Sequence, residues 1–306
     1  MKDILSCQSE WPEVAIIILN WNNYEDTARC LSSLEDVNYP NYTIYVVDNA
    51  SSDNSLQRLH EDYPWCRFIE NSENQGFAGG CNRGIERALE DGMDHVLLLN
   101  NDTIVSSTFL KPLIKTVECN EKVALVGGII EYMNEEGLWY AGSTFNPTLA
   151  KSGHQTTIKD TKPYHTEHVT GALMLLSGEF IVNGNYLDED YFFGYEDVEI
   201  SWRARRNGWK TLVAPDSCIQ HEVSSTAGFR SPFKFYHATR NRMKFAQNLT
   251  LYKQVVFYTF FMLTRLIRAA QWYSSFPGRI KAIGKGIVDH LLGRPPRKPD
   301  EFDKSG

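Results

Sequence analysis

The stretch LLLNNDT, residues 97–103, passes from apolar residues directly into two amides and a carboxylate. Packing alone does not require polar side chains at the end of a buried strand, so this stretch raises the question of a binding site. Asp102 is a candidate metal ligand, because Mg²⁺ and Mn²⁺ prefer carboxylate oxygen and often complete their shell with a diphosphate. His221 is a second candidate that suits Mn²⁺ better than Mg²⁺, and the alternative for a lone histidine is a structural role.

Two further acidic clusters are candidates for chemistry. Asp48 and Asp53, in VVDNASSDNS, could accept hydrogen bonds from a ribose or from the N–H edge of a nucleobase, or they could be turn residues. Glu196 and Asp197 stand at the start of an expected helix, where acidic side chains favour the helix dipole. A partly buried carboxylate at that position is equally suited to act as a general base.

Strand and helix signals alternate through the first 130 residues, which predicts βαβ units and a parallel sheet between two layers of helices. The strands predicted from apolar, β-branched runs are 14–20, 42–49, 95–100 and 123–130. Ligands of such sheets bind beyond the carboxyl ends of the strands. Asn20, Asp48 and Asn100 all stand at those ends, and three polar ends on one rim favour a site over three unrelated turns.

The second half of the chain is less regular. A buried strand is predicted within 168–178, a helix within 192–209 and a short strand at 210–215, followed by a loop that carries His221.

Composition limits the class of protein. A chain of 306 residues with 42% hydrophobic and 12% aromatic residues predicts one large domain with an appendage. The six cysteines are scattered without a CxxC pair, which argues against a zinc site or a disulfide framework and suits a reducing cytoplasm. The first ten residues show no signal-peptide pattern, and no segment offers the roughly 20 apolar residues of a membrane span.

The charge is unevenly distributed. Residues 230–306 hold 15 lysines and arginines against 4 acidic residues, a net +11, while the whole chain carries −7. A basic tail on an acidic body indicates an anionic partner. The aromatic and aliphatic residues of the tail favour a membrane surface over nucleic acid.

Seven motifs in order resemble the family 2 inverting glycosyltransferases with the GT-A fold, and within them the rhamnosyltransferase-like branch. They are NWNN, VVDNASSDNS, NQGFAGGCNRGI, LLLNNDT, TGALML, FFGYEDVEISWRARRNGW and IQHEVSS. The resemblance covers roughly residues 12–245. It implies an α/β domain, residues 1–245, with a mostly parallel central sheet flanked by helices, and a basic, aromatic helical extension, residues 246–306.

The resemblance also implies roles for single residues. Asp197 matches the catalytic base of the ED motif, with Glu196 beside it, and Asp102 matches the metal-binding end of the DxD-type motif, with His221 completing the site. The implied cofactor is Mn²⁺ or Mg²⁺. Asn100 replaces the first carboxylate of a strict DxD, which gives His221 more weight. Residues matching the donor-nucleotide site are Asn20, Asp48, Asp53, Asn74, Gly76, Phe77, Asn82 and Asn101, and residues on the acceptor side are Gly171, Trp202 and Arg240.

The function implied by the resemblance is metal-dependent, inverting transfer of a sugar from a nucleotide-diphosphate donor, of the dTDP-rhamnose or UDP-hexose type. The acceptor is a hydroxyl of a glycan or of a lipid-linked acceptor, in the assembly of cell-surface polysaccharides or glycoprotein glycans. The physics agrees with these roles, because a divalent metal neutralises the charge that develops on the leaving diphosphate. Asp197 would take the proton of the attacking hydroxyl.

The sequence of the C-terminal tail predicts the location of the protein in the cell. A basic helix is expected within 236–249, and 251–273 mixes aromatic and aliphatic residues with Lys and Arg around an apolar core, 255–263, that is too short to span a bilayer. This pattern suits a helix lying in the membrane interface, which predicts a peripheral enzyme on the cytoplasmic face. The alternative is packing on the domain or on a second subunit of a homodimer.

Three other classes of protein match the sequence less well. A dinucleotide-binding oxidoreductase needs glycines after the first strand, and LNWNNYED has none. A sugar-nucleotide pyrophosphorylase needs an early Gly-rich phosphate loop with a lysine, which is absent. A catalytically inactive scaffold that binds a nucleotide sugar or a membrane would not need Asp102, Asp197 and His221 together.

Overall fold

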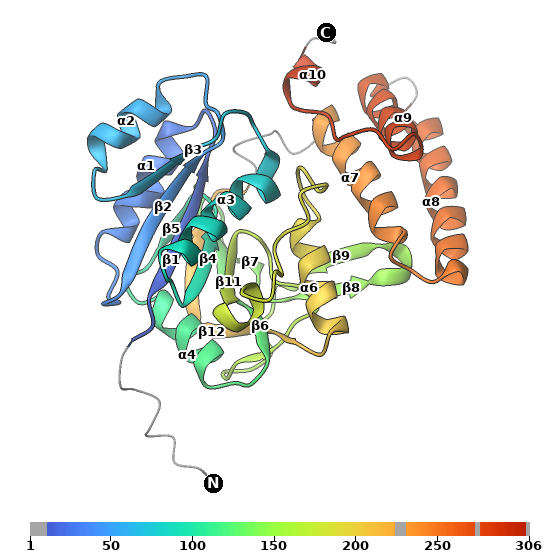
Figure 1. Ribbon diagram of the computed structural model, residues 1–306. Helices are drawn as coiled ribbons and strands as arrows, with labels where there is room; N and C mark the ends of the chain where they lie inside the picture. The colour runs from blue at the N-terminus through green and yellow to red at the C-terminus, as the bar shows by residue number, and fades with distance from the viewer. Residues whose placement is uncertain (1–10, 224–230, 273–275, 304–306) are drawn as a thin grey trace.

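The structure, a computed structural model, describes residues 11–223, 231–272 and 276–303. Its centre is a ten-stranded mixed sheet, with eight strands in the order β10-β12-β6-β11-β4-β1-β2-β3, while β5 attaches to β12 and β7 to β6. Helices lie on both sides of the sheet, and a group of helices from the C-terminal part of the chain lies beside it (Figure 1). The ten N-terminal residues, on which the expectation about a signal peptide rests, lie outside the described residues.

The predicted βαβ units form the first half of the sheet. The parallel strands are β1 (Val14–Asn20), β2 (Tyr42–Asp48), β3 (Arg67–Glu70) and β4 (His95–Leu99), and the helices that connect them are α1 (Tyr24–Leu34), α2 (Ser55–Asp62) and α3 (Gly76–Glu90). β1 and β4 are buried on both sides, because their alternate side chains belong to two separate core clusters. Burial on both sides explains their continuous apolar runs.

The centre of the sheet departs from a parallel arrangement. β11 (Leu173–Ser177) is the strand predicted within 168–178, and it runs antiparallel between β4 and β6 (Val123–Tyr132). An apolar run buried on both sides has no feature that states its direction, so the pattern predicts the strand but not its orientation.

The prediction of a loop around His221 is wrong. β12 (Lys210–His221) continues through Cys218 and ends at His221, after an irregularity between Val213 and Cys218 in its pairing with β6. Pro215 and Asp216 interrupt the apolar pattern there, which is why the pattern predicts an early end. The last residues of β12 pair antiparallel with β5 (Thr103–Val105).

Short elements complete the body of the molecule. They are α4 (Leu110–Glu118), β7 (Leu138–Tyr140), β8 (Ser143–Asn146), the 3₁₀ turn η1 (Pro147–Leu149), β9 (Lys151–His154), β10 (Tyr164–His165), α5 (Gly178–Ile181) and α6 (Glu196–Arg206). β8 and β9 form a separate two-stranded sheet, and η1 at its tip contacts the C-terminal helices.

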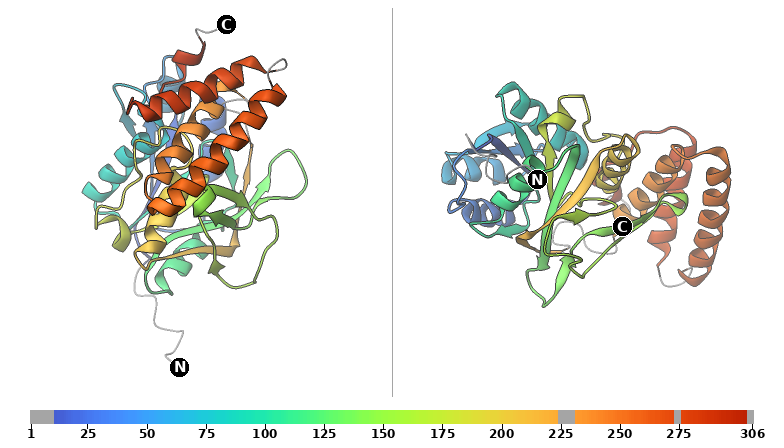
Figure 2. Two further views of the ribbon diagram at one scale, coloured as in Figure 1. Left: turned by 90° about the vertical axis from the view of Figure 1, so that its right-hand side faces the viewer. Right: turned by 90° about the horizontal axis from the view of Figure 1, so that it is seen from below.

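The C-terminal helices pack on one another beside the sheet. They are α7 (Pro232–Ala246), α8 (Leu251–Trp272), α9 (Pro277–Leu291) and the short α10 (Asp300–Asp303) (Figure 2). α7 and α8 occupy the two predicted helical stretches, and α9 lies within the predicted helical extension, residues 246–306. α9 approaches α7 closely at Gly286, where a Cβ atom would lie 2.8 Å from the Tyr236 carbonyl oxygen. Among the described helices, none combines the length and the hydropathy that crossing a membrane requires.

Candidate active site

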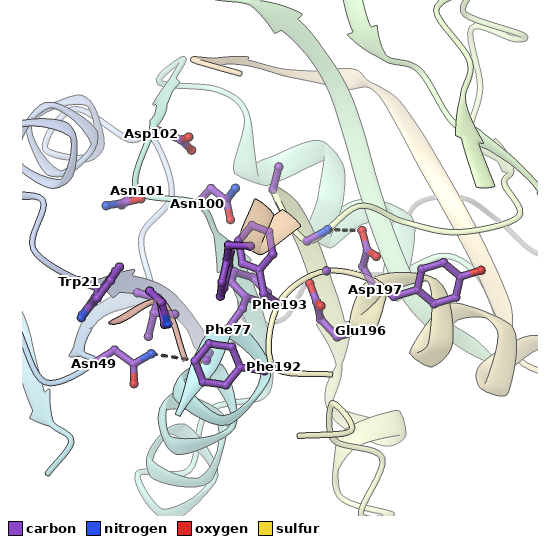
Figure 3. A pocket seen from close by; sticks show the side chains of 18 of the residues that line it. Trp21, Asn49, Phe77, Asn100, Asn101, Asp102, Phe192, Phe193, Glu196 and Asp197 are labelled. Carbon is purple, nitrogen blue, oxygen red and sulfur yellow. Dashed lines mark hydrogen bonds between the residues drawn. The ribbon is translucent and has the colours of Figure 1, made fainter. Parts of the chain in front are cut away.

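A cavity of about 710 Å³ opens at the rim formed by the carboxyl ends of β1 and β4. Its wall comes from the segments that follow β1, β2 and β4, from Gly171 just before β11, and from the starts of α3 and α6. Asn100, Asn101 and Asp102 all line it, as does the pair Glu196 and Asp197 (Figure 3). The cavity therefore opens at the edge of the sheet where the sequence predicts a site.

Asp102 lines one corner of the cavity and there contacts His221, which does not itself line the cavity. The antiparallel register pairs His221 with Thr103, the residue after Asp102, and the Glu222 amide donates to the Asp102 carbonyl at 2.9 Å. This pairing brings His221 Nε2 to 3.0 Å from Asp102 Oδ1, and each of the two residues is 6% exposed. Two residues far apart in sequence thus present a carboxylate oxygen and an imidazole nitrogen side by side.

The spacing of these two atoms fits a shared divalent ion. At about 2.1 Å per bond, neighbouring ligands of an octahedral ion stand about 3 Å apart. Among the described residues, no group of three or more histidines, cysteines and acidic residues is placed to hold a metal. The two side chains therefore fit part of a metal shell, which water and a donor diphosphate would complete, as Mg²⁺ and Mn²⁺ sites commonly require.

Asp197 lies at another point of the cavity, at the start of α6. Its Oδ2 accepts a hydrogen bond from the Gly171 amide at 3.2 Å, and its Oδ1 accepts one from the Val198 amide at 2.7 Å (Figure 3). The residue before the ED pair, Tyr195, has a φ of 84°, in the left-handed region that bulky residues rarely adopt. A fixed backbone and two amide donors hold the carboxylate in one orientation.

Burial shifts the acidity of the ED pair. It raises the pKa of Asp197, although the amides of Gly171 and Val198 oppose this shift. Burial, followed by the charge of Asp197, raises the pKa of Glu196 well above its usual range. A carboxyl with a raised pKa is a stronger base once ionised, which suits Asp197 for removing a proton from a hydroxyl.

Hydrogen bonds donated by side-chain and backbone amides fix the other side of the cavity. The Asn49 side chain donates to Asn74 Oδ1 and to the Gly76 carbonyl, both at 3.0 Å, and the Gly76 amide donates to Asn74 Oδ1 at 2.9 Å. The Phe77 amide donates to the Phe192 carbonyl at 2.8 Å. These bonds fix the start of α3, so Asn74, Gly76 and Phe77 line the cavity as predicted, and Asn49 joins them.

Gly76 is required at this point by its backbone and its surroundings. Its φ is +74°, and a Cβ atom would lie 2.3 Å from the Phe192 carbonyl oxygen. We expect Gly76→Ala to destabilise the protein by roughly 1–3 kcal/mol, seen as a lower Tm in thermal unfolding. Gly92→Ala is the matched control, because Gly92 has a φ of +79° with nothing within 4 Å. Equal losses from the two variants would contradict a steric role for Phe192.

Four predicted donor residues lie outside the cavity lining and use their polar groups internally. Asn20 and Asp48 are buried, and the Asn20 amide donates to Asp48 Oδ1 at 2.9 Å. Asp53 accepts from the Ser55 amide at 3.0 Å, and Asn82 donates to the Leu187 carbonyl at 2.9 Å. Their positions make them supports for the loops of the rim. Of the eight predicted donor residues, the other four line the cavity: Asn101, together with Asn74, Gly76 and Phe77.

The acceptor-side predictions divide in the same way. Gly171 lines the cavity and donates to Asp197. Trp202 packs against Phe245, with ring centroids 4.9 Å apart, and does not line the cavity. Arg240 is 7% exposed, outside the lining, and donates to the carbonyls of Asp190 and Arg294. Trp202 and Arg240 thus hold α7 against the rest of the protein.

The sequence reasoning missed several lining residues. His154 comes from β9, and burial, with the neighbouring His168, lowers its pKa to about 4, so it is neutral at pH 7. Pro299 and Phe302 come from the C-terminal segment. No local pattern marks these three, because only the tertiary fold brings them to the rim. Trp21 did carry a signal, since it stands between the two asparagines at the end of β1.

Comparison with known proteins identifies the group. The sequence model of the family described as Glycosyl transferase family 2 matches residues 15–181, more than half of the chain. A curated relative, the Low-salt glycan biosynthesis hexosyltransferase Agl10 of Haloferax volcanii, is 27% identical in an alignment of 248 residues that covers 77% of this chain and 76% of that protein.

Two solved structures share the fold. The structure of GalNAc-T7 with UDP, GalNAc and Mn²⁺ has a TM-score of 0.69 at 16% identity, and the match covers 97% of this chain but 57% of that one. The mannosyltransferase PcManGT from Pyrobaculum calidifontis, in complex with GDP-Man and Mn²⁺, has a TM-score of 0.57 at 13% identity, covering 93% of this chain and 88% of that one. The predicted GT-A fold is confirmed. Together with the family match, it establishes that the chain belongs to glycosyl transferase family 2 and is a glycosyltransferase.

Proposed function

We propose that this enzyme is a metal-dependent, inverting glycosyltransferase that moves a sugar from a nucleotide-diphosphate donor to an acceptor hydroxyl. The observation that carries the proposal is that one cavity is lined both by Asp197, held by two amides, and by Asp102, whose carboxylate contacts His221 outside the lining. A single displacement needs a base at the acceptor hydroxyl and a positive charge at the leaving diphosphate. Asp197 and Asp102, at separate points of the cavity wall, are placed to supply the base and to hold the ion (Figure 3).

In this reaction the acceptor oxygen forms a bond to the anomeric carbon as the bond from that carbon to the diphosphate oxygen breaks. The proton of the hydroxyl passes to Asp197, and the electron pair of the broken bond leaves with the nucleoside diphosphate. The acceptor attacks from the side opposite the leaving group, so the anomeric configuration inverts. Burial and the charge of Asp197 raise the pKa of Glu196 well above its usual range, so Asp197 is the proposed base of the two.

Asp102 and His221 are proposed to hold the Mn²⁺ or Mg²⁺ ion. Held there, a divalent ion would neutralise charge on the leaving diphosphate. The loop braced by Asn49 and Asn74 is proposed to hold the nucleotide, with Asn101 and Phe77 in contact and with Asn20, Asp48, Asp53 and Asn82 supporting the rim. Gly171 is proposed to lie on the acceptor side, next to the base.

The proposed donor is dTDP-rhamnose or a UDP-hexose, and the proposed acceptor is a glycan or a lipid-linked acceptor in surface polysaccharide or glycoprotein assembly. The name of the relative Agl10, a hexosyltransferase of glycan biosynthesis, supports this. The test is a thermal-shift screen of nucleotide sugars with and without Mn²⁺, since a ligand at about 100 times its Kd adds about 2.7 kcal/mol of stability. Donors that shift the Tm are then assayed for release of nucleoside diphosphate with Mn²⁺ and a lipid-linked acceptor. No shift and no release with any donor would contradict the proposal.

The extension is proposed to place the enzyme on the cytoplasmic side of the membrane as a peripheral protein. Exposed apolar side chains on α8 support this, including Leu251, Tyr252, Val255, Leu263 and Leu266, each more than half exposed. Two aromatic side chains of the same helix, Phe257 and Phe261, are buried against the body and fix the orientation of α8. A homodimer through the exposed side is the competing outcome, which light scattering would detect.

The raised pKa of Asp197 predicts the pH dependence of transfer. The base works only when ionised, so kcat/KM is expected to fall as the pH drops through a pKa above the ordinary range of an aspartate. A pH–rate profile at soluble-acceptor concentrations well below saturation measures this, with circular dichroism at each pH as the control for folding. An acidic limb at or below the usual aspartate pKa would contradict the assignment.

A further inference from the structure

Two aromatic side chains of the cavity wall take no part in the proposed binding of the ion and the nucleotide or in the proton transfer. They are Trp139, from β7, and His154, from β9. The ring centroid of Trp139 lies 4.7 Å from that of His221 and 4.4 Å from that of His154, with an edge-on arrangement in both pairs. Trp139 thus connects the imidazole that contacts Asp102 to a second imidazole that lines the cavity.

His154 also lies near the proposed base. It is an exposed residue, and as part of the lining it offers its surface to the cavity. The protein packed around its ring lowers the pKa of His154, and among the smaller causes the charge of Asp197 acts in the opposite direction. The imidazole is therefore within electrostatic reach of Asp197, while its ring contacts Trp139.

The backbone holds both side chains in place. β7 pairs with β6 of the central sheet, and Trp139 packs against the core beneath it. The Ala141 amide donates to the Gln155 carbonyl at 2.7 Å, and the Gln155 amide donates to the Gly142 carbonyl at 2.8 Å. These two bonds join the segments that directly follow Trp139 and His154. The two rings are therefore positioned before a substrate binds, which lowers the entropic cost of binding.

The geometry of the reaction indicates what lies against these rings. In a single displacement the transferred sugar lies between the base and the leaving diphosphate. Asp197 and Asp102 mark these two points of the cavity wall (Figure 3). Trp139 and His154 line the same cavity, one in contact with the histidine beside Asp102 and the other within reach of Asp197. They therefore face the place of the sugar ring.

The chemistry of the two side chains suits a sugar. A hexose ring presents C–H groups on its faces and hydroxyl groups around its edge. The indole of Trp139 offers a large apolar surface to such a face. The neutral imidazole of His154 offers one hydrogen-bond donor and one acceptor, as a sugar hydroxyl does. Neither side chain carries a positive charge at pH 7, so neither is suited to hold the diphosphate.

We propose that Trp139 and His154 form the subsite for the transferred sugar, in which the indole contacts a C–H face of the ring and the imidazole hydrogen-bonds to a hydroxyl. The inference rests on the proposed function and deepens it, because it names the residues that would distinguish one donor sugar from another. Both are binding residues: neither takes the proton of the acceptor, and neither holds the ion.

Calorimetric titration of the full chain in the presence of Mn²⁺ isolates the contribution of the sugar. The ligands are UDP and UDP-glucose, and dTDP and dTDP-rhamnose. Within each pair, the ratio of the Kd of the nucleoside diphosphate to the Kd of the nucleotide sugar reports the sugar, because both ligands share the nucleotide and the ion. For the donor pair that the wild type binds, we expect Trp139→Ala to lower this ratio roughly tenfold or more. We expect His154→Ala to lower it roughly two- to tenfold, the value of one hydrogen bond.

Matched variants control for general effects. Trp65→Ala removes a tryptophan that is 45% exposed, and His165→Ala removes an exposed histidine; neither residue lines the cavity, so both variants should keep the wild-type ratio. His154→Gln should retain more of the ratio than His154→Ala, because an amide also has a donor and an acceptor. If Trp139→Ala does not fold, Trp139→Phe replaces it, with a smaller expected fall in the ratio because the phenyl ring covers less of the sugar.

The outcomes separate the possible failures. No binding of any nucleoside diphosphate or nucleotide sugar by the wild type would overturn the proposed function, and the sugar subsite with it. Equal losses of affinity for both members of a pair in the Trp139 variant would overturn the subsite alone, because they would show that Trp139 acts only by orienting His221. An unchanged ratio in His154→Ala would overturn the subsite as well.

Discussion

Replacing Asp197 with asparagine is expected to lower the rate of sugar transfer by roughly 10²–10⁴-fold, the usual contribution of a general base. The amide has the size of the carboxylate and can still accept a hydrogen bond from the Gly171 amide, but it cannot take the proton of the acceptor hydroxyl. Donor binding, measured by thermal shift, should stay close to that of the wild type, because the base acts on the acceptor.

The direction in which Asp197→Asn changes the stability of the protein can also be predicted. The pKa of Asp197 is raised in the folded protein, so protonation favours folding, and that contribution is lost as the pH rises through the folded pKa. Above it the wild type carries a buried charge that Asp197→Asn lacks, so the variant should unfold at an equal or higher temperature. Asp216→Asn, at an exposed position, is the matched control. Wild-type turnover in Asp197→Asn with an inactive Glu196→Gln would move the base to Glu196.

Replacing Asp102 with alanine is expected to abolish measurable transfer, a loss of roughly 10³-fold or more, because several kcal/mol of charge stabilisation at the diphosphate would be missing. His221→Ala should act in the same direction with a smaller effect, since the histidine contributes no negative charge. The readout besides activity is the Mn²⁺-dependent rise in Tm in the presence of a nucleoside diphosphate, which should disappear in Asp102→Ala.

Two controls keep this prediction testable. His165→Ala removes an exposed histidine from β10 and should retain both the metal-dependent shift and the activity. Exhaustive treatment with EDTA should reproduce the loss seen in Asp102→Ala, and added Mn²⁺ should restore the wild type alone. Activity that survives chelation would exclude a metal from the transfer step and would leave positive side chains to stabilise the diphosphate.

Features that are encoded locally can be predicted from the sequence. A switch from apolar to polar residues marks the ends of β1, β2 and β4, and the helix dipole marks the start of α6, so both Asp102 and Asp197 stand out in the sequence alone. The parallel half of the sheet follows from the alternation of strands and helices. These features depend on neighbours within about ten residues, which a pattern can register.

The rest depends on contacts between distant residues. The direction of β11 is set by pairing with β4 and β6, and His154 reaches the cavity because β8 and β9 fold back as a hairpin. Pro299 and Phe302 line the cavity from the C-terminal segment. In that segment Lys298 forms an ion pair with Glu73, with Nζ 2.8 Å from Oε2. Deleting the extension to test membrane binding would therefore also remove cavity wall, so substitutions on its surface are the better instrument.

The late position of β12 in the chain has a consequence for how the enzyme matures. β4 and β6 cannot be joined until β11 has been made, and β5 gains its partner only when the end of β12 arrives. Such long-range pairing is slow to form and leaves strand edges open in the meantime. Since His221 is the last residue of β12, the two side chains proposed to bind the metal meet only at the final closure of the sheet. An ion that binds both side chains would stabilise the closed sheet relative to the open one. We therefore expect Mn²⁺ present during synthesis to raise the yield of folded enzyme, in addition to its effect on turnover.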